Sequence, residues 1–214
     1  MNITGAIFDM DGTLLDSMQM WDNVGQNYLR SIGLEPREGF REVLRPLSLR
    51  QSAEYMKEAY GIDRTPEQIM EDIDHGIEQR YFNDLPLKPG VKEMLDRLRR
   101  RGVRMCIATA TDRYLVEAGL RRVGILDCFE FILTCTEVGS GKDQPKIYET
   151  ALQRLGTAKE TTYIFEDALY AIETAKRACF PVVGVYDESA LATMDRIRSL
   201  SDIFIRSAQD WEAI

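Results

Sequence analysis

Apolar residues in the first 84 positions recur with a helical period, apart from one short run near the start. Residues 6–8, Ala-Ile-Phe, form a continuous apolar run that ends at Asp9 and predicts a buried strand. A helix is then predicted from about Ser17 to Gly33, because four apolar residues follow at helical spacing. These are Trp21, Val24, Tyr28 and Ile32. Residues 16–84 contain no convincing strand pattern, so this region is predicted to be all-helical.

Two further helices in this region carry recognisable start signals. Ser48 is the expected N-cap of a helix that ends at Gly61. Thr65, Pro66 and Gln68 form the pattern of a capping box and predict the start of the next helix. The apolar stripe of that helix comprises Ile69, Ile73, Ile77 and Tyr81.

After residue 84 the pattern changes to an alternation of strands and helices. The segment DLPLKPG, residues 84–90, reads as a return linker into a helix that ends at Gly102. The predicted strands cover residues 103–109, 129–134, 161–167 and 181–187, and the helices between them cover about 112–123, 146–155 and 168–178. Such alternation predicts an α/β fold with a doubly wound parallel sheet and helices on both faces.

The all-helical region therefore interrupts an α/β domain. We expect a core formed by residues 1–15 and 85–214, and a small helical cap, residues 16–84, inserted after the first strand. Right-handed crossovers bring the carboxyl ends of all parallel strands to one edge of a sheet, where ligands of such folds bind. A cap inserted at that edge would act as a lid.

Composition limits the classes of protein that remain. The chain has 214 residues, is 44% hydrophobic and 29% charged, and has no apolar run near the ~18 residues needed to span a bilayer. No signal peptide or lipidation pattern is recognisable, so we expect a cytoplasmic protein. The net charge of -8 disfavours a nucleic-acid or membrane partner. Four arginines at 97 and 99–101 end a predicted helix, where cations complement the helix dipole.

The numbers and spacing of cysteine and histidine exclude further classes of metal and catalytic site. The four cysteines show no CxxC spacing and are expected to be reduced, with Cys106 and Cys179 in apolar settings. The single histidine, His75, lies off the apolar stripe of its helix and is expected to be exposed. A multi-histidine metal site is therefore impossible, and a Ser-His-Asp centre would depend on this one residue.

Carboxylates gather at the ends of two predicted strands. Asp9 and Asp11 follow the first strand, and Glu166 and Asp167 close the strand over 161–167. If these ends meet at one edge, up to four carboxylates converge there, and the cluster is unstable unless a cation neutralises it. Oxygen ligands without histidine or thiolate favour Mg²⁺ over Ca²⁺. An EF-hand loop does not fit, because its first ligand would fall on Ile7.

Two more side chains extend this constellation. Thr109 ends the second predicted strand, and Lys142 lies on a loop after the third, within GSGKDQPK. GSGK is not a P-loop, since Asp143 stands where that motif needs serine or threonine. Carboxylates, Mg²⁺, an ammonium group and a hydroxyl group together suit a phosphoryl group. Asp9 could attack it and form an aspartyl-phosphate, while Asp11 could protonate the leaving oxygen and then deprotonate water.

These residues resemble the four motifs of the haloacid dehalogenase-like hydrolases, in order and over nearly the whole chain. The motifs are FDMDGT at residues 8–13, Thr109, Lys142 and the pair Glu166–Asp167. The resemblance implies a Rossmann-like core, a mobile type-one cap and Mg²⁺ as cofactor. It also implies Asp9 as nucleophile, Asp11 as acid/base and main-chain Mg²⁺ ligand, Thr109 and Lys142 as phosphate binders, and Asp167 as Mg²⁺ ligand with Glu166 nearby.

Three positions depart from the usual family pattern. Ala168 and Ala171 stand where a serine and a glycine are common, and Lys146 replaces an acid. A missing hydroxyl near a metal ligand and an exchanged charge bear on metal affinity rather than on mechanism.

Within the family, simple phosphatases and a β-phosphoglucomutase branch share this chemistry up to the aspartyl-phosphate. The mutase branch usually has a histidine shortly after the first motif, where this chain has Met18, Gln19 and Met20. We therefore expect a phosphatase that hydrolyses a small phosphorylated metabolite and acts as a monomer. A phosphoacceptor signalling domain and a catalytically inactive binding protein are lower-ranked alternatives. No motif in residues 16–84 names the substrate.

Overall fold

The computed structural model describes residues 2–44, 47, 49–206 and 210, and forms two compact units. The first unit comprises Met1–Met18 and Leu85–Ile214, and the second comprises Gln19–Asp84. The second unit thus begins three residues after the boundary predicted from the sequence. The expected helix cap at Ser48 lies outside the described residues.

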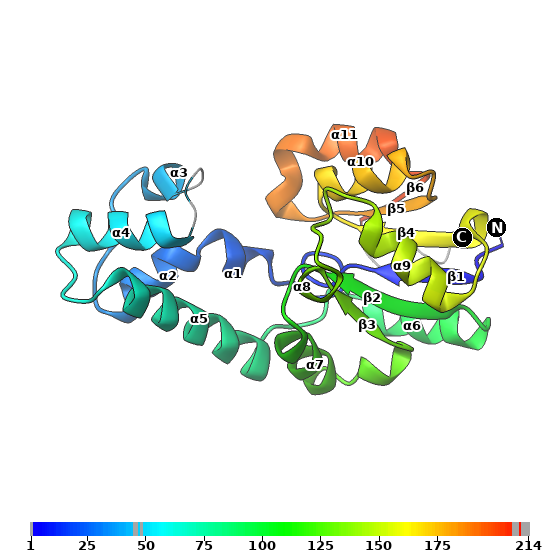
Figure 1. Cartoon of the computed structure of the whole chain (residues 1–214), viewed down its shortest axis with the longest axis horizontal. Helices are drawn as coiled ribbons and strands as arrows, with labels where there is room; N and C mark the ends of the chain where they lie inside the picture. The colour runs from blue at the N-terminus through cyan, green and yellow to red at the C-terminus, as the bar shows by residue number, and fades with distance from the viewer. Residues whose placement is uncertain (1, 45–46, 48, 207–209, 211–214) are drawn as a thin grey trace. The chain divides into compact units, whose positions relative to one another are not determined.

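The first unit is built on a six-stranded parallel sheet (Figure 1). Its strands are β1 (Gly5–Phe8), β2 (Arg104–Thr109), β3 (Ile132–Thr134), β4 (Thr162–Glu166), β5 (Val182–Val185) and β6 (Ile203–Ile205). Their order is β3-β2-β1-β4-β5-β6, which is the order of a doubly wound Rossmann-like sheet. The predicted fold class is therefore confirmed. Strand β6 escaped prediction because it is only three residues long and half-exposed over its first two.

Helices cover both faces of this sheet. They are α6 (Val91–Arg100), α7 (Arg113–Arg122), α8 (Cys135–Val138), α9 (Lys146–Leu155), α10 (Leu169–Arg177) and α11 (Met194–Leu200). Short 3₁₀ turns are η1 (Leu126–Cys128), η2 (Lys159–Thr161) and η3 (Glu188–Thr193). Because crossovers between parallel strands are right-handed, α6 and α7 lie on one face and α9, α10 and α11 lie on the other.

Side chains alternate between the two faces along each strand, as the pleat requires. Ile7 and Ile164 point into the core beneath α9 and α10, together with Ile147 and Ile172 from these helices. The neighbouring Phe8 points to the opposite face, where its ring stacks on Phe165 with 4.2 Å between centroids. Each such buried side chain contributes roughly 1.5–3 kcal/mol to folding.

The strand order places a topological switch point beside β1. Phe8 pairs with Ile107 of β2 on one side and with Phe165 of β4 on the other. From β1 the sheet continues outward through β2 and β3, and from β4 it continues in the other direction through β5 and β6. The connections at the carboxyl ends of β1 and β4 therefore diverge. The residues that follow β1 and β4 flank the position where open α/β sheets bind ligands.

The second unit is all-helical within the described residues, as predicted. Its helices are α1 (Met18–Asp22), α2 (Val24–Ser31), α3 (Phe40–Leu44), α4 (Leu49–Tyr60) and α5 (Pro66–Asn83). The capping box at the start of α5 is confirmed: Thr65 Oγ1 accepts from Gln68 N at 3.2 Å, and Thr65 N donates to Gln68 Oε1 at 2.9 Å.

The prediction of one continuous helix from Ser17 to Gly33 was wrong. The structure breaks it at Asn23, whose side-chain amide donates to the Gln19 carbonyl at 2.7 Å. A short polar side chain that bonds to nearby backbone in this way competes with the helical hydrogen-bond ladder. Two short helices, α1 and α2, therefore replace one long one.

The histidine and cysteine predictions have mixed outcomes. The His75 side chain is 69% exposed, as predicted. All four cysteines are free, but Cys179 is exposed rather than held in an apolar setting, and its φ of 61° lies in the left-handed region. It follows α10, at the kind of position where left-handed residues often end helices. Among the described residues, the helices are too short or too polar to cross a bilayer.

Candidate functional site

Asp9 is the first residue after β1 and lies at the switch point. Its backbone N–H donates to the Phe165 carbonyl at 3.0 Å, so the chain is still tied to β4 at this position. The residue is 8% exposed. An ionised carboxylate at this depth needs compensating partners.

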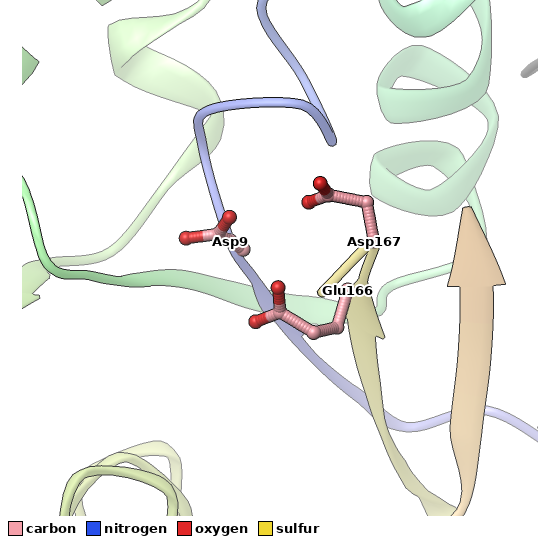
Figure 2. A group of neighbouring side chains, drawn as sticks. All are labelled: Asp9, Glu166 and Asp167. Atoms are coloured by element: carbon pink, nitrogen blue, oxygen red, sulfur yellow. The ribbon is translucent and has the colours of Figure 1, made fainter. Parts of the chain in front are cut away.

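Glu166 and Asp167 approach Asp9 from the end of β4. Figure 2 shows the three side chains, with those of Glu166 and Asp167 extending from β4 toward Asp9. One oxygen from each carboxylate lies within 4.8 Å of the others, and all three residues are buried. Among the described residues, they form the group of acidic side chains that could hold a metal ion. We call Asp9, Glu166 and Asp167 the carboxylate group.

Lys142 supplies the ammonium of this site. Its Nζ donates to Oδ1 of Asp9 and, at 2.8 Å, to Oε2 of Glu166. The residue is only 4% exposed. Burial alone would lower the pKa of Lys142, but the carboxylates of Asp9 and Glu166 outweigh it and hold this pKa well above its ordinary value. Lys142 is therefore charged, and its loop is anchored to β1 and β4 together.

One ammonium does not balance three carboxylates. Burial and the charge of Glu166 raise the pKa of Asp9 to about 7, although Lys142 opposes the rise. Burial, Glu166 and Asp9 raise the pKa of Asp167 well above its ordinary value. These pKa shifts indicate that the carboxylate group is short of positive charge. Its donors are all oxygens, which fits a hard divalent cation rather than a soft one.

Gly12 and Thr13 shape the loop that faces Asp167. Gly12 has φ +81°, and a Cβ at this residue would lie 2.3 Å from Oδ2 of Asp167, so no other residue fits without displacing that carboxylate. Thr13 Oγ1 donates to Oδ1 of Asp167 at 2.9 Å. The loop thus leaves room for Asp167 and also fixes its orientation.

Asp11 lies near this group but has different partners. Its Oδ1 accepts from Ser17 Oγ and its Oδ2 accepts from Thr111 Oγ1, both at 2.6 Å. In the part of the chain described, its carboxylate is not one of the metal-capable acids. The expectation that Asp11 binds Mg²⁺ concerned its main chain and stays a prediction, as does its role as acid and base.

Thr109 ends β2 and is 1% exposed. Its Oγ1 accepts from the backbone N–H of Thr111 at 3.1 Å. The hydroxyl therefore shapes the turn after β2, and its expected role in binding phosphate stays a prediction.

Sequence reasoning missed four residues of this site, among them Ser17, which was expected only to begin a helix. Thr13 belongs to the FDMDGT motif, but its bond to Asp167 was not foreseen. Thr111 follows Thr109 by two residues, so a second hydroxyl on the same turn was a usable signal. Tyr148 gave none: it lies on an apolar helix stripe, and its buried hydroxyl lies 3.4 Å from Oε2 of Glu166.

The departures from the family pattern have identifiable contacts. The Lys146 ammonium donates to the Val138 carbonyl at 2.8 Å, at the last residue of α8. The backbone N–H of Ala168 donates to Oε1 of Glu166 at 3.2 Å. Glu166 is thus held from both of its oxygens.

Comparison with known proteins agrees with this geometry. Residues 6–185 match the model of the haloacid dehalogenase-like hydrolase family. The chain is 28% identical over 151 residues to a phosphorylated carbohydrates phosphatase of Thermotoga maritima, covering 70% of this chain and 69% of the relative. It is 30% identical over 168 residues to protein CbbY of Rhodobacter capsulatus, covering 72% and 73%.

A solved structure from Thermotoga maritima, described as a candidate β-phosphoglucomutase, has the same fold. It aligns with a TM-score of 0.84 at 24% identity and covers 99% of this chain and 98% of the other. The family model spans the switch point, Asp9, Lys142 and the Glu166–Asp167 pair. The chain therefore belongs to the haloacid dehalogenase-like hydrolases, as its motifs predicted.

Proposed function

We propose that this protein is a Mg²⁺-dependent phosphatase that hydrolyses a small phosphomonoester through an aspartyl-phosphate on Asp9. The observation that carries the proposal is the position of Lys142, which donates to both Asp9 and Glu166 inside a buried carboxylate group. A fixed cation beside a buried carboxylate suits an anionic nucleophile that must approach an anionic phosphoryl group.

Asp9 has the position a nucleophile needs, at the carboxyl end of β1. In the first step a carboxylate oxygen of Asp9 forms a bond to phosphorus while the bond to the leaving oxygen breaks. In the second step water attacks phosphorus and releases Asp9 and inorganic phosphate. Lys142 offsets negative charge in both steps, and Thr109 is the expected hydroxyl donor to the phosphoryl oxygens.

Asp11 is the proposed acid and base. It gives a proton to the leaving oxygen in the first step and takes a proton from water in the second. Ser17 and Thr111 hold its two oxygens at 2.6 Å, so its carboxylate is oriented and distinct from the carboxylate group. Two carboxylates two residues apart thus divide the work.

Asp9, Glu166 and Asp167 are the side chains that would hold Mg²⁺, together with the main chain of Asp11. Their fit to the ion rests on the all-oxygen donor set and on the raised pKa values of Asp9 and Asp167. When bound, the ion would supply positive charge that keeps the carboxylates ionised and offsets the charge of the phosphoryl group.

Sugar phosphates are the proposed substrate class. The relatives named above include a phosphorylated carbohydrates phosphatase, which favours this class over other phosphomonoesters. We expect the second unit, Gln19–Asp84, to select the substrate, because the core residues described above act on the phosphoryl group and the leaving oxygen and not on the rest of the substrate. Action on soluble metabolites in the cytoplasm fits the acidic net charge of -8.

The test is phosphate release from a panel of sugar phosphates and small phosphomonoesters, with Mg²⁺ or with EDTA. We expect Mg²⁺-dependent release that Asp9→Asn abolishes. Asp195→Asn, an exposed aspartate on α11, is the control and should keep full activity. Silence of the wild type across the panel would overturn the proposal.

The same panel separates the phosphatase from a mutase, whose fold the chain shares. β-Glucose 1-phosphate is included with detection of glucose 6-phosphate. Glucose 6-phosphate without free phosphate would show that a sugar hydroxyl, rather than water, receives the phosphoryl group. Free phosphate alone would support the phosphatase.

A further inference from the structure

Lys88 forms a largely buried ion pair outside the carboxylate group. Its Nζ lies 2.7 Å from Oδ2 of Asp187 and donates to the Tyr186 carbonyl, also at 2.7 Å. The two side chains are only 14% and 6% exposed. Oδ1 of Asp187 accepts from the N–H and hydroxyl of Ser189 at 2.9 and 2.6 Å. Both charges are therefore paired and hydrogen-bonded.

The backbone around Lys88 pairs with the segment that follows the first motif. Lys88 N donates to the Leu14 carbonyl at 2.9 Å, and Asp16 N donates to the Pro86 carbonyl at 2.9 Å. Leu15 and Leu87 form an antiparallel bridge between these two bonds. The return segment 85–88 and residues 14–16 thus form a short two-stranded ribbon within the first unit.

This ribbon closes the loop that carries Asp11. Leu14 N donates to the Met10 carbonyl at 2.8 Å, and Gly12 N donates to the Leu15 carbonyl at 3.0 Å. An ion pair and a series of backbone hydrogen bonds therefore connect Asp187, through Lys88 and the ribbon, to the residues on both sides of Asp11.

We propose that Lys88 is a positioning residue for Asp11: its pairing with Asp187 fixes the ribbon against the end of β5, and the ribbon fixes the loop that aims Asp11. Among the described residues, the Lys88 ammonium bonds to Asp187 and the Tyr186 carbonyl and to no proposed reacting group, while its charge partly opposes the rise in the pKa of Asp167 that burial and the neighbouring carboxylates cause. The inference rests on the proposed function, in which Asp11 protonates the leaving oxygen. A purely structural ion pair would stabilise the fold without any preference among substrates.

The leaving group distinguishes these two roles. A sugar alkoxide needs a proton from Asp11, whereas 4-nitrophenolate leaves without one because it is a far weaker base. If Lys88 positions Asp11, Lys88→Met lowers kcat/KM about tenfold or more on a sugar phosphate but less than about threefold on 4-nitrophenyl phosphate, because a misplaced general acid forfeits part of its ~10²–10⁴ contribution. The ratio kcat/KM is compared because it reports the transfer to Asp9, whereas kcat also contains the water step that both substrates share. Lys88→Arg should restore most of the sugar phosphate rate.

Removing only the lysine leaves Asp187 buried and unpaired, which is strongly destabilising. The double variant Lys88→Met/Asp187→Asn removes both charges and carries the test if the single variant fails to fold. Lys176→Met is the matched control, because its ion pair with Asp202 has the same 2.7 Å distance but is 30% and 43% exposed. We expect the control to keep the wild-type kcat/KM on both substrates.

Equal losses of kcat/KM on both substrates, or no loss on either, would overturn the positioning role. A wild-type protein inactive on both substrates would instead overturn the proposed function, and the inference with it. A loss of kcat/KM confined to the sugar phosphate supports the positioning role, provided that the melting temperatures of the double variant and the wild type agree within a few degrees.

Discussion

The ammonium of Lys142 lies 2.8 Å from Oε2 of Glu166, with both side chains almost fully buried. Lys142 also donates to Asp9, so one cation joins the ends of β1 and β4. The same glutamate belongs to the carboxylate group that could hold a metal. Glu166 therefore links the ammonium to the proposed metal position, and the charge balance of the site depends on Lys142.

Replacing Lys142 with methionine should affect stability and activity together. The metal-free protein should lose about 3 kcal/mol or more of unfolding free energy, because breaking a buried ion pair leaves uncompensated charge. Phosphate release should fall at least about a hundredfold, as for other fixed electrostatic donors. Denaturant titration and steady-state kinetics measure these effects. Lys146→Met, whose ammonium contacts the Val138 carbonyl, should change neither strongly.

The metal-free protein should become less stable as the pH rises from about 4 to about 7. Unfolded Asp9 titrates near 3.8, whereas burial and Glu166 raise its folded pKa to about 7. Between these values the folded state binds the additional proton at Asp9, so the stability falls with increasing pH, and the Asp9 contribution is fully lost above about 7. Unfolding titrations in EDTA check this, and Asp9→Asn should reduce the slope.

Mg²⁺ should reverse this trend, because a ligand that binds only the folded state stabilises it. The increase in melting temperature on adding Mg²⁺ should be larger at pH 8 than at pH 5. An equal increase at both values would contradict the assignment of the ion to the carboxylate group.

Gly12→Ala should abolish activity and weaken Mg²⁺ binding. The added Cβ would lie 2.3 Å from Oδ2 of Asp167, and the left-handed φ of +81° adds strain of about 1–2 kcal/mol. Gly102→Ala separates these causes, since Gly102 has φ +75° but no described atom lies within 4 Å of its added Cβ. The control should lose stability but keep its kcat and its Mg²⁺ affinity, which calorimetric titration measures. Equal Mg²⁺ affinities for the two variants would argue against the clash.

Tyr148→Phe should weaken Mg²⁺ binding a few-fold without loss of packing. It removes a buried hydroxyl 3.4 Å from Oε2 of Glu166 and leaves the ring in place. Tyr28→Phe is the matched control, because the Tyr28 hydroxyl is buried and has no hydrogen-bond partner among the described residues. Removing an unpaired hydroxyl should be neutral or stabilise by about 1 kcal/mol. If both variants bind Mg²⁺ like the wild type, Tyr148 has no role in orienting Glu166.

The fold could be predicted from the sequence wherever a periodic pattern was long enough. The apolar runs of β1, β2 and β4 and the capping box at Thr65 were sufficient for the α/β class and for α5. The helix break at Asn23 could not be predicted, because it depends on one side-chain hydrogen bond to Gln19 that no periodicity reveals. Strand β6 is defined by pairing with β5 rather than by its own pattern.

The candidate site was predictable to the extent that strand ends predict convergence. Asp9, Glu166 and Asp167 follow from strand position alone. The partners of Asp11 could not be found this way, because Ser17 and Thr111 meet it through loops whose conformation depends on packing. The same holds for Lys88 and Asp187, which are 99 positions apart and share no motif.

The central position of β1 also affects how the protein is made. Gly5 pairs with Arg104 on one side and Thr162 on the other, so the first strand synthesised cannot be paired on both sides until β4 has left the ribosome. Contacts so distant in sequence form slowly, and an unpaired apolar strand is prone to aggregation meanwhile. A chain truncated after residue 150 would contain Asp9 and Lys142 but lack β4. Because β1 would then be unpaired on one side, this chain should be inactive and insoluble.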